Sequence, residues 1–382
     1  MSKFGGFLAA VFLLFIIMGK IFFPFGDEPD FDRRVDRLYN DSALSFFLND
    51  EAESELLNLK CTQSSSRPDI SFSISTNCID QNLSTFVDRI FYTLLVVSPL
   101  VLLMFFRRFF YYALKSNKHI TYCDWNRRLD AISLTLIFPS AIYFLGLFSR
   151  EVVTTAISLL LLLFWGRRLI VTAILLVIYY IDSGNAVPVI FFTITLLLYD
   201  LFSKKTYRPY LIALISFLII SFSYFFSDYL IFYIVQNFNF NKMNMLYNSI
   251  FLDGHHDKYP ILLRSVITYI SLVFMTAEGV KSLPLLIITT LFLLYLVAIG
   301  IFKKTKFILR SDKSYVLPVF AGITTIFFIT ITFPTHSYGK YYLFLLPFVA
   351  YALLFFYNKA YLAMIFIGFT ILMFVAIILG YV

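Results

Sequence analysis

The chain has 382 residues, of which 60% are hydrophobic and only 14% are charged, and its mean hydropathy is +0.81. Soluble globular chains are about half apolar and about a quarter charged, so this composition excludes an ordinary soluble domain. The net charge of +8 is divided by region: residues 26–88 carry thirteen acidic and five basic side chains, and the rest of the chain carries ten and twenty-six. A basic remainder made of short loops between apolar segments is the positive-inside pattern of membrane proteins and not a nucleic-acid-binding face.

Long uncharged apolar segments recur along the chain, for example at residues 152–166 and 211–227. A helix needs roughly 17–25 apolar residues to cross a bilayer, and only helices or closed barrels satisfy their backbone polar groups there. Because these segments are continuous and do not alternate with polar residues, they favour helices over a barrel. The sequence therefore predicts an all-α, polytopic transmembrane helical bundle in which residues 1–382 form a single transmembrane domain.

The first predicted span covers residues 7–25, and it is expected to stay as an anchor because no small-residue cleavage site follows it. The acidic segment 26–88 comes next and is predicted to be one larger extracytoplasmic loop, too poor in hydrophobic residues to fold alone. Cys61 and Cys78 both lie in this loop. An oxidising exterior would allow a disulfide between them, and a reducing one would leave two thiols, so both alternatives stay open.

Strongly basic segments alternate with short corners that have no net positive charge in the next part of the chain. The predicted spans lie at residues 89–106, 129–148, 152–165, 169–181, 186–200 and 209–226. The basic segments 107–128, 166–168 and 203–208 mark the inside of the membrane, and the corners 149–151 and 182–185 mark the outside.

Residues 228–259 leave the number of spans open. Their apolar piece, residues 229–235, is too short to span a bilayer, and five basic residues follow later in the segment 303–313. The positive-inside rule favours an inside position for 303–313, which requires one more crossing before residue 261 or a re-entrant segment. The remaining helices are predicted at residues 261–276, 283–302, 315–333, 341–357 and 361–382, for a total of 12 or 13 spans.

Ionisable residues at the predicted outer corners are the first candidates for chemistry. Asp27 and Glu28 directly follow the first span, where carboxylates can take a proton from a sugar hydroxyl or bind a metal ion. Arg150 and Glu151 lie between two spans, and the planar fork of arginine suits phosphate or pyrophosphate. The simpler interpretations are a solvated loop for the carboxylates and an interfacial ion pair for Arg150 and Glu151.

Two later segments also carry candidates. His255 and His256 are of a type that binds metals, but no second cluster completes a coordination sphere, so no metal site is predicted and a polar loop is favoured. Arg264 lies within an apolar segment, where a charge needs a partner or a function. The side of the membrane on which Arg264 lies depends on the path of residues 228–259.

His336 and Lys340 form a further outward corner, unless they and the neighbouring tyrosines act only as interfacial anchors. A lipid-pyrophosphate donor needs basic groups near its phosphates and a carboxylate or histidine near the acceptor hydroxyl. The corners that carry Asp27, Arg150 and His336 would supply such groups on one face. The sequence contains no glycine-rich phosphate loop, GxSxG elbow or paired-cysteine metal site, and no cofactor is predicted.

Three segments resemble multi-span glycosyltransferases of the GT-C type. They are the pair Asp27–Glu28 after the first span, the segment Phe138–Glu151 that joins two early helices, and the segment Lys340–Pro347 that opens a late one. The small size, the short loops and the many spans are more similar to the Wzy-type or EpsG-like polymerases of bacterial surface polysaccharide.

The resemblance implies a multi-pass protein of the bacterial inner membrane that extends a glycan outside from undecaprenyl-pyrophosphate-linked repeats. It implies that Arg150, and Arg264 if it faces out, hold the donor, while Asp27 or Glu28 activates the acceptor. Its implied partners are a lipid-linked oligosaccharide, membrane lipids and other polysaccharide-assembly proteins, without nucleic acid. The polymerases carry their large outer loops later than residues 26–88, which keeps a GT-C transferase of single sugars as an alternative.

Two other classes of protein remain as rivals. A transporter or flippase predicts charges buried in mid-span and two pseudo-symmetric halves, whereas this sequence has mostly corner charges and no internal repeat. A non-catalytic membrane scaffold predicts that the outer corners do not gather in space.

Overall fold

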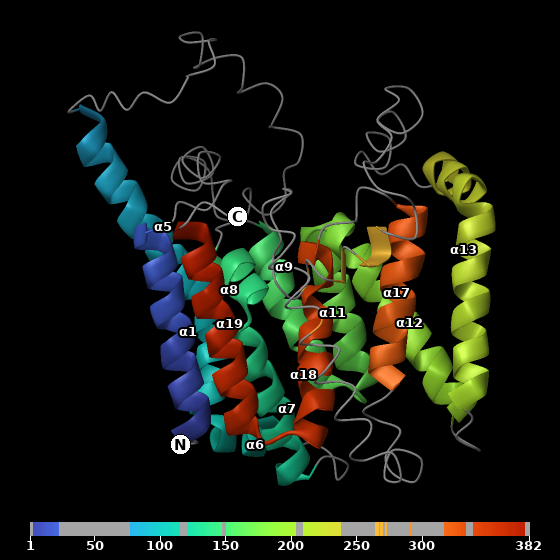
Figure 1. The fold of residues 1–382 in the computed structure, drawn as a ribbon, viewed down its shortest axis with the longest axis horizontal. Coiled ribbons are helices and arrows are strands. Elements are labelled where there is room, and N and C mark those ends of the chain that lie inside the picture. Colours follow the sequence, from blue (N-terminus) through green and yellow to red (C-terminus); the bar gives the residue numbers. More distant parts are fainter. Residues whose placement is uncertain are drawn as a thin grey trace.

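The computed structural model describes residues 3–22, 77–114, 121–146, 150–203, 209–237, 264–266, 268–269, 272, 291, 317–333 and 339–378. Within these ranges the fold is all-helical, with thirteen α-helices and one 3-10 helix, η5 (Figure 1). This confirms the predicted all-α class. The helices are α1 (Lys3–Phe22), α5 (Asn77–Phe105), α6 (Arg107–Leu114), α7 (Tyr122–Leu136), α8 (Pro139–Gly146), α9 (Arg150–Leu159), α10 (Leu161–Phe164), α11 (Arg168–Ile181), α12 (Ser183–Ser203), α13 (Pro209–Asn237), α17 (Leu317–Thr332), η5 (Gly339–Leu345), α18 (Leu346–Phe356) and α19 (Lys359–Ile378).

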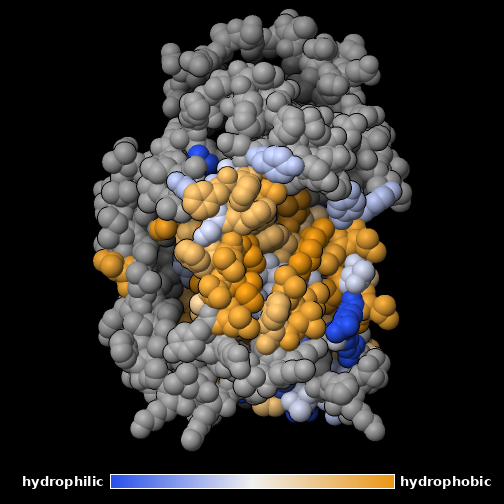
Figure 2. All heavy atoms as spheres, turned by 90° about the vertical axis from the view of Figure 1, so that its right-hand side faces the viewer, coloured by the Kyte–Doolittle hydropathy of each residue, from blue (hydrophilic) through white to orange (hydrophobic). Residues whose placement is uncertain are grey.

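Several of these helices are long and apolar enough to cross a membrane. Gly184–Phe202 and Gly339–Phe356 meet this condition as single helices, and two bent helix pairs meet it if each pair counts as one span. The described residues therefore hold two to four candidate spans. The face of the bundle that carries α13 exposes a broad apolar surface, which includes Phe217, Leu218 and Phe225 (Figure 2). An exposed apolar surface of this kind is expected where a protein meets lipid.

The first bent pair joins α5 to α6, whose axes differ by 88° across a break at Phe106. α5 begins at Asn77, inside the segment 26–88 that was predicted to be a loop, so the end of that segment is helical. Cys78 lies in this first turn of α5, and the pairing with Cys61 falls outside the described residues. α6 turns away from the α5 axis and carries Arg107 and Arg108 at its start.

The second bent pair divides the predicted helix 129–148 into α7 and α8, at an angle of 75°. Pro139 explains the break, because proline lacks an N–H and disfavours helical geometry in the residue before it. A break inside an apolar bundle leaves backbone groups without their helical partners. Thr370 of α19 satisfies one of them, since its Oγ1 donates to the carbonyl of Ile137 at 2.6 Å.

α13 also differs from the prediction. The expected helix 209–226 and the short apolar piece 229–235 form one element that is kinked at Phe226, where φ is −117° and ψ is 16°. The short piece is therefore a continuation of α13 beyond the kink. Residues 238–259, which complete the segment that left the span count open, lie outside the described residues.

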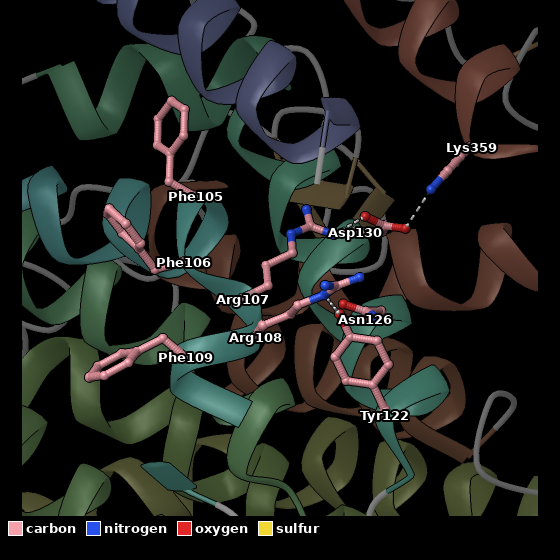
Figure 3. Close-up of a pocket in the computed structure, with 9 residues that line it drawn as sticks. All are labelled: Phe105, Phe106, Arg107, Arg108, Phe109, Tyr122, Asn126, Asp130 and Lys359. Atoms are coloured by element: carbon pink, nitrogen blue, oxygen red, sulfur yellow. Dashed lines mark hydrogen bonds and ion pairs between the residues drawn. The ribbon is translucent and has the colours of Figure 1, made fainter. Parts of the chain in front are cut away.

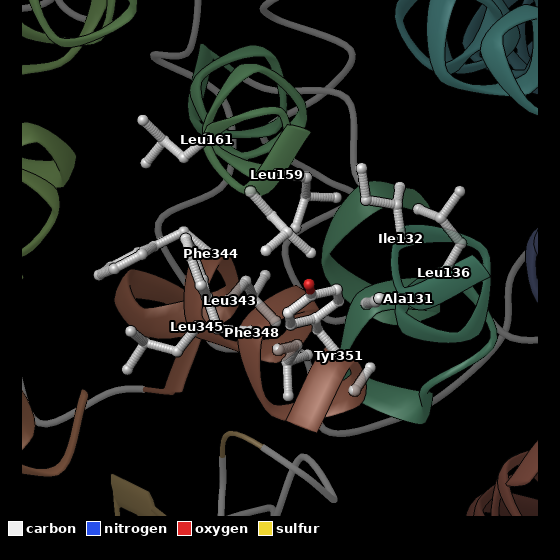
Figure 4. Packing of buried hydrophobic residues seen from close by; sticks show 14 of the residues in the cluster. Ala131, Ile132, Leu136, Leu159, Leu161, Leu343, Phe344, Leu345, Phe348 and Tyr351 are labelled. Carbon is white, nitrogen blue, oxygen red and sulfur yellow. The ribbon is translucent and has the colours of Figure 1, made fainter. Parts of the chain in front are cut away.

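The buried core extends through the described bundle, and Figure 4 shows the part of it between α7, the α9–α10 segment and the pair η5–α18. Ala131 of α7 is small and fully buried, so α18 approaches closely there, and Tyr351 of α18 lies against α7. In a lipid environment helix association depends on such close packing and on buried hydrogen bonds, because lipid tails are as apolar as leucine. The hydroxyl of Tyr199 provides such bonds, since it contacts Ser216 of α13 and Thr324 of α17, the latter at 2.9 Å.

The helices define two ends of the bundle. We call the end that carries Arg107, Arg128 and Lys359 the basic end, and the other the opposite end. Arg128 Nη1 donates to the carbonyls of Leu162 and Trp165 at 2.9 and 3.0 Å, so α10 finishes at the basic end and α9 begins at the opposite end.

α17 runs antiparallel to α12. Tyr199, near the finish of α12, bonds to Thr324, whereas Phe191, nearer the start of α12, stacks on Phe328 with the ring centroids 4.1 Å apart. Since α12 starts at the opposite end, α17 finishes there.

Ion pairs join α6, α7 and α19 at the basic end. Arg107 pairs with Asp130, and its Nη2 donates to Ser133 Oγ at 2.9 Å. Lys359 Nζ lies 3.3 Å from the other oxygen of Asp130. Nearer this end on the same helix, Asp124 pairs with Arg128 at 2.9 Å and accepts a 2.6 Å hydrogen bond from Tyr351 Oη of α18.

Candidate functional site

A small polar cleft lies at the opposite end, between α9, the corner of α11 and α12, and η5. Its polar lining consists of Thr154, Thr155, Ser158, Asn185 and Lys340. The cleft holds only about 10 Å³, which is room for about one water molecule. It is therefore a point where polar side chains converge, and a sugar would have to bind further out, beyond the cleft.

Asp182 shapes this corner by capping α12. Its Oδ1 accepts hydrogen bonds from the backbone N–H groups of Gly184 and Asn185 at 2.9 and 3.3 Å. A carboxylate at this position satisfies the otherwise unpaired N–H groups of the first helical turn and interacts favourably with the helix dipole. Asp182 is largely buried, and its carboxylate is engaged in this cap.

Asn185 links the cap to α9. Its Nδ2 donates to Asp182 Oδ2 at 2.9 Å and to Thr154 Oγ1 at 3.1 Å, and both Asn185 and Thr154 are buried. These two bonds hold the start of α12 against the first turns of α9. The link from α12 to α9 at this end is therefore an amide–hydroxyl hydrogen bond, between Asn185 and Thr154.

Arg150 and Glu151 are the first two residues of α9. Position 150 shares a helix face with position 154, because residues four apart lie one above the other. The backbone thus places Arg150 one turn beyond Thr154, at the outer edge of the polar cleft. The side chains of Arg150 and Glu151 lie outside the described residues.

Lys340 comes from a segment 190 residues later in the chain and lines the same cleft. It is the second residue of η5 and is half-buried, with Nζ 5.2 Å from the ring centroid of Tyr341. A cation at this distance from an aromatic ring is held by its quadrupole. The structure thus brings Lys340 beside α9, which begins with Arg150.

Arg264 belongs to the same end. Its neighbour Ser265 is buried, and the Ser265 and Thr330 hydroxyls lie 2.6 Å apart. Thr330 is in the last turn of α17, which finishes at the opposite end. The sequence left the side of Arg264 undecided, and this contact places it toward the end that carries Arg150 and Lys340.

Arg150, Lys340 and Arg264 are predicted site residues that the structure locates at the opposite end. Asp27, Glu28, His255, His256 and His336 lie outside the described residues. In the described ranges, no group of three or more His, Cys, Asp or Glu side chains is arranged to hold a metal ion.

The sequence analysis missed two features of this corner and one at the basic end. The run from Asp182 to Asn185 carried a helix-cap signal, an Asp before a helix, but it was interpreted only as an outer turn. Thr154 gave no signal, because threonine is common in apolar helices. Asp130 was detectable as a carboxylate inside an apolar segment, which needs a partner.

Comparisons of this chain with protein-family models, curated proteins and solved structures gave no match. The resemblance to membrane glycosyltransferases therefore depends on the sequence segments alone.

Proposed function

We propose that this chain is a multi-pass glycosyltransferase of the bacterial inner membrane, with 12 or 13 spans, that acts on polyprenyl-pyrophosphate-linked sugars. Within that class we propose a polymerase of surface polysaccharide, such as O-antigen, capsule or exopolysaccharide. The observation that carries the proposal is the location of three arginine and lysine residues, Arg150, Arg264 and Lys340, toward one end of the bundle. They come from three distant parts of the chain. Lys340 lines the cleft beside Asn185, and the backbone of Arg150 lies one helical turn from Thr154 of the same cleft.

The positive-inside rule supplies the orientation. Arg107, Arg108, Arg128 and Lys359 gather at the basic end, which would then face the cytoplasm. The opposite end would face outward, where the donor is a sugar carried on a lipid pyrophosphate. Arginine is suited to such a donor because its guanidinium binds phosphate oxygens in a bidentate way.

In the proposed reaction the acceptor hydroxyl attacks the anomeric carbon of the donor sugar. A carbon–oxygen bond to the acceptor forms as the bond between that carbon and the pyrophosphate breaks. Asp27 or Glu28 accepts the hydroxyl proton, and the lipid pyrophosphate leaves with the bonding electron pair. Arg150, Arg264 and Lys340 stabilise the negative charge that grows on the leaving group, and such charge stabilisation is usually the largest contribution to catalysis.

Alanine replacement tests this assignment in the native host, with polysaccharide chain length read on a gel and protein level read by immunoblot. Arg150→Ala and Arg264→Ala are each expected to lower polymerisation by roughly 100-fold, by analogy with the removal of one charge-stabilising group, and Asp27→Ala is expected to shorten the chains too. Arg168→Ala is the matched control, because Arg168 is exposed and lies at the basic end. Unchanged long chains in both Arg150→Ala and Asp27→Ala, at normal protein levels, would refute the assignment.

The alternative within the same chemistry is a GT-C transferase that adds one sugar from a lipid-linked donor. The acidic segment after α1 motivates it, because the polymerases carry large outer loops later. The same gel separates the two: loss of one sugar from every glycan indicates the transferase, and loss of long chains indicates the polymerase. If sugar transfer is intact in every variant while lipid-linked repeats accumulate inside, the protein is a flippase.

A further inference from the structure

A wide cavity lies at the basic end, away from the proposed transferase site. It holds about 470 Å³, within the range of about 300–1,000 Å³ typical of ligand pockets. Helices α6, α7 and α19 supply its polar lining, and Figure 3 shows Arg107, Arg108, Tyr122, Asn126, Asp130 and Lys359 around it. Three cations and one carboxylate give this lining a formal charge of +2.

The cations of this cavity differ in how far they are already paired. Arg107 is almost fully buried, and its guanidinium is engaged by Asp130, by Ser133 and by the carbonyl of Met104. It therefore fixes Asp130 and contributes charge, but it has little capacity left for a ligand. Asp130 in turn is shared between Arg107 and Lys359, so one carboxylate serves two cations.

Arg108 and Lys359 keep donors for a ligand. Arg108 is exposed, and within the described part of the chain its side-chain hydrogen bond is the one from Nε to Tyr122 Oη, at 3.3 Å. Its two Nη groups thus retain the paired donors that bind phosphate. The Lys359 side chain is 46% exposed, and its Nζ has two further hydrogens besides the one directed at Asp130.

Backbone groups add to the attraction for an anion. α19 begins at Lys359, on the rim of the cavity, and Asn358 caps it by accepting a 3.1 Å hydrogen bond from the N–H of Ala360. The start of a helix carries a partial positive charge from its aligned peptide dipoles. The cavity is therefore positive through both its side chains and its helix geometry.

An apolar rim distinguishes this cavity from an ordinary basic surface. Phe105, Phe106 and Phe109 line it as well, and in Figure 3 their rings point away from the cations. Phe106 and Phe109 are exposed, as is Leu102 one turn earlier on α5. A helix that bears basic groups on one face and aromatic rings on another is typical of the membrane–water interface.

We propose that this cavity binds the phosphate of an anionic phospholipid from the cytoplasmic leaflet. Arg108 and Lys359 hold the phosphate oxygens, Tyr122 and Asn126 supply neutral hydrogen-bonding groups, and the acyl chains follow the exposed apolar surface of α5. The cytoplasmic leaflet is the anionic one, and a basic residue near its surface contributes about 1 kcal/mol to attraction. The binding requires a membrane-embedded chain with the basic end inside, and it does not require glycosyl transfer.

Thermal unfolding of the purified full-length chain in detergent tests this proposal. Phosphatidylglycerol is added to the micelles in steps, phosphatidylcholine is the zwitterionic lipid arm, and inorganic phosphate is the arm without acyl chains. We expect a saturable rise of Tm with phosphatidylglycerol only, because a ligand that binds the folded state stabilises it by mass action. An equal rise with phosphatidylcholine, or with inorganic phosphate at the same concentration, would overturn the proposal.

Variants locate the binding. Arg108→Gln and Lys359→Gln are each expected to raise the half-saturating phosphatidylglycerol concentration roughly fivefold, as expected for the loss of one basic residue near the membrane surface. Arg168→Gln is the matched control, since Arg168 is exposed at the same end but does not line the cavity. An unchanged lipid response in the double variant Arg108→Gln/Lys359→Gln, or an equal loss in Arg168→Gln, would overturn the site.

Discussion

At the basic end of the bundle, ion pairs join the helices beside a wide cavity. At the opposite end, an amide–hydroxyl hydrogen bond joins α12 to α9 beside a cleft that holds about one water. Arg107 and Asp130 are buried ions, whereas Asn185 and Thr154 form an amide–hydroxyl pair. Removing one member of a buried ion pair leaves an uncompensated charge and costs about 3–5 kcal/mol, while removing one neutral hydrogen bond costs about 1 kcal/mol. The basic end should therefore dominate stability, although the proposed chemistry belongs to the opposite end.

The largest effect is expected for Asp130→Asn. This change leaves Arg107 buried without its carboxylate and also removes the partner of Lys359, so the free energy of unfolding should fall by about 3 kcal/mol or more. Unfolding of the purified protein in mixed micelles measures the loss. Asp124→Asn is the control, because Asp124 is more exposed than Asp130 and should cost less. A loss below about 1 kcal/mol for Asp130→Asn would show that the ion network does not dominate stability.

Gly5→Ala tests the same network from α1. A Cβ at position 5 would lie 2.7 Å from Cζ of Arg107, so the guanidinium would have to move away from Asp130. We expect a loss of about 1–3 kcal/mol, the usual cost of overpacking. Gly368→Ala is the matched control on α19, since a Cβ there meets nothing within 4 Å, and better helix propensity should make it neutral or slightly stabilising. Equal effects of the two changes would contradict close packing of Arg107 on α1.

Asn185→Ala probes the opposite end. It removes the donor to Thr154 and one hydrogen bond to Asp182, and it should lower the free energy of unfolding by about 1–2 kcal/mol. If the Asn185–Thr154 hydrogen bond positions α9, polysaccharide chains should shorten in this variant more than in Thr193→Val. That control removes a buried hydroxyl of α12 whose hydrogen bond, among the described residues, is to the carbonyl of Val189 in the same helix. If Asn185→Ala destabilised the protein as much as Asp130→Asn, the basic end would not contribute more to stability than the opposite end.

The smallest stability effects are expected for two buried tyrosines of the last candidate span, Tyr351 and Tyr342, and the two should differ. Tyr351→Phe removes the hydrogen bond to Asp124 and should cost about 1 kcal/mol in the free energy of unfolding. Tyr342→Phe should be neutral or stabilising, because the Tyr342 hydroxyl is fully buried and has no hydrogen-bond partner among the described residues. Thermal unfolding of both variants, compared with the parent protein, measures the difference. A larger loss of stability for Tyr342→Phe than for Tyr351→Phe would indicate that a ligand or a water molecule forms a hydrogen bond with the Tyr342 hydroxyl.

Helix positions were predictable from the sequence where a long apolar segment forms the helix. The helix expected at residues 315–333 is α17 at Leu317–Thr332, and the one expected at 169–181 is α11 at Arg168–Ile181. The break before Pro139 was also readable in principle, since proline disfavours a continuous helix, but the hydropathy of residues 129–148 suggested one span. The joining of residues 229–235 to α13 was missed, because a kinked helix and two separate segments have the same composition.

The candidate site was predictable only in part, because its geometry comes from contacts between distant segments. Arg150 and Lys340 stood out as ionisable residues at corners, yet only the packing of η5 on α9 brings their segments together. The end of the bundle on which Arg264 lies depends on one hydroxyl contact, between Ser265 and Thr330. The pairing of Asp130 with Lys359 joins residues 229 positions apart, and no local pattern encodes it.

That pairing has a consequence for the biogenesis of the protein. Asp124 and Asp130 are translated with α7, whereas Tyr351 and Lys359 leave the ribosome more than 220 residues later. At about 5–20 residues per second, the two carboxylates wait on the order of tens of seconds for these partners. A nascent chain that stops before α19 would hold Asp130 with Arg107 alone, so the ion network at the basic end is complete only after α19 has been made.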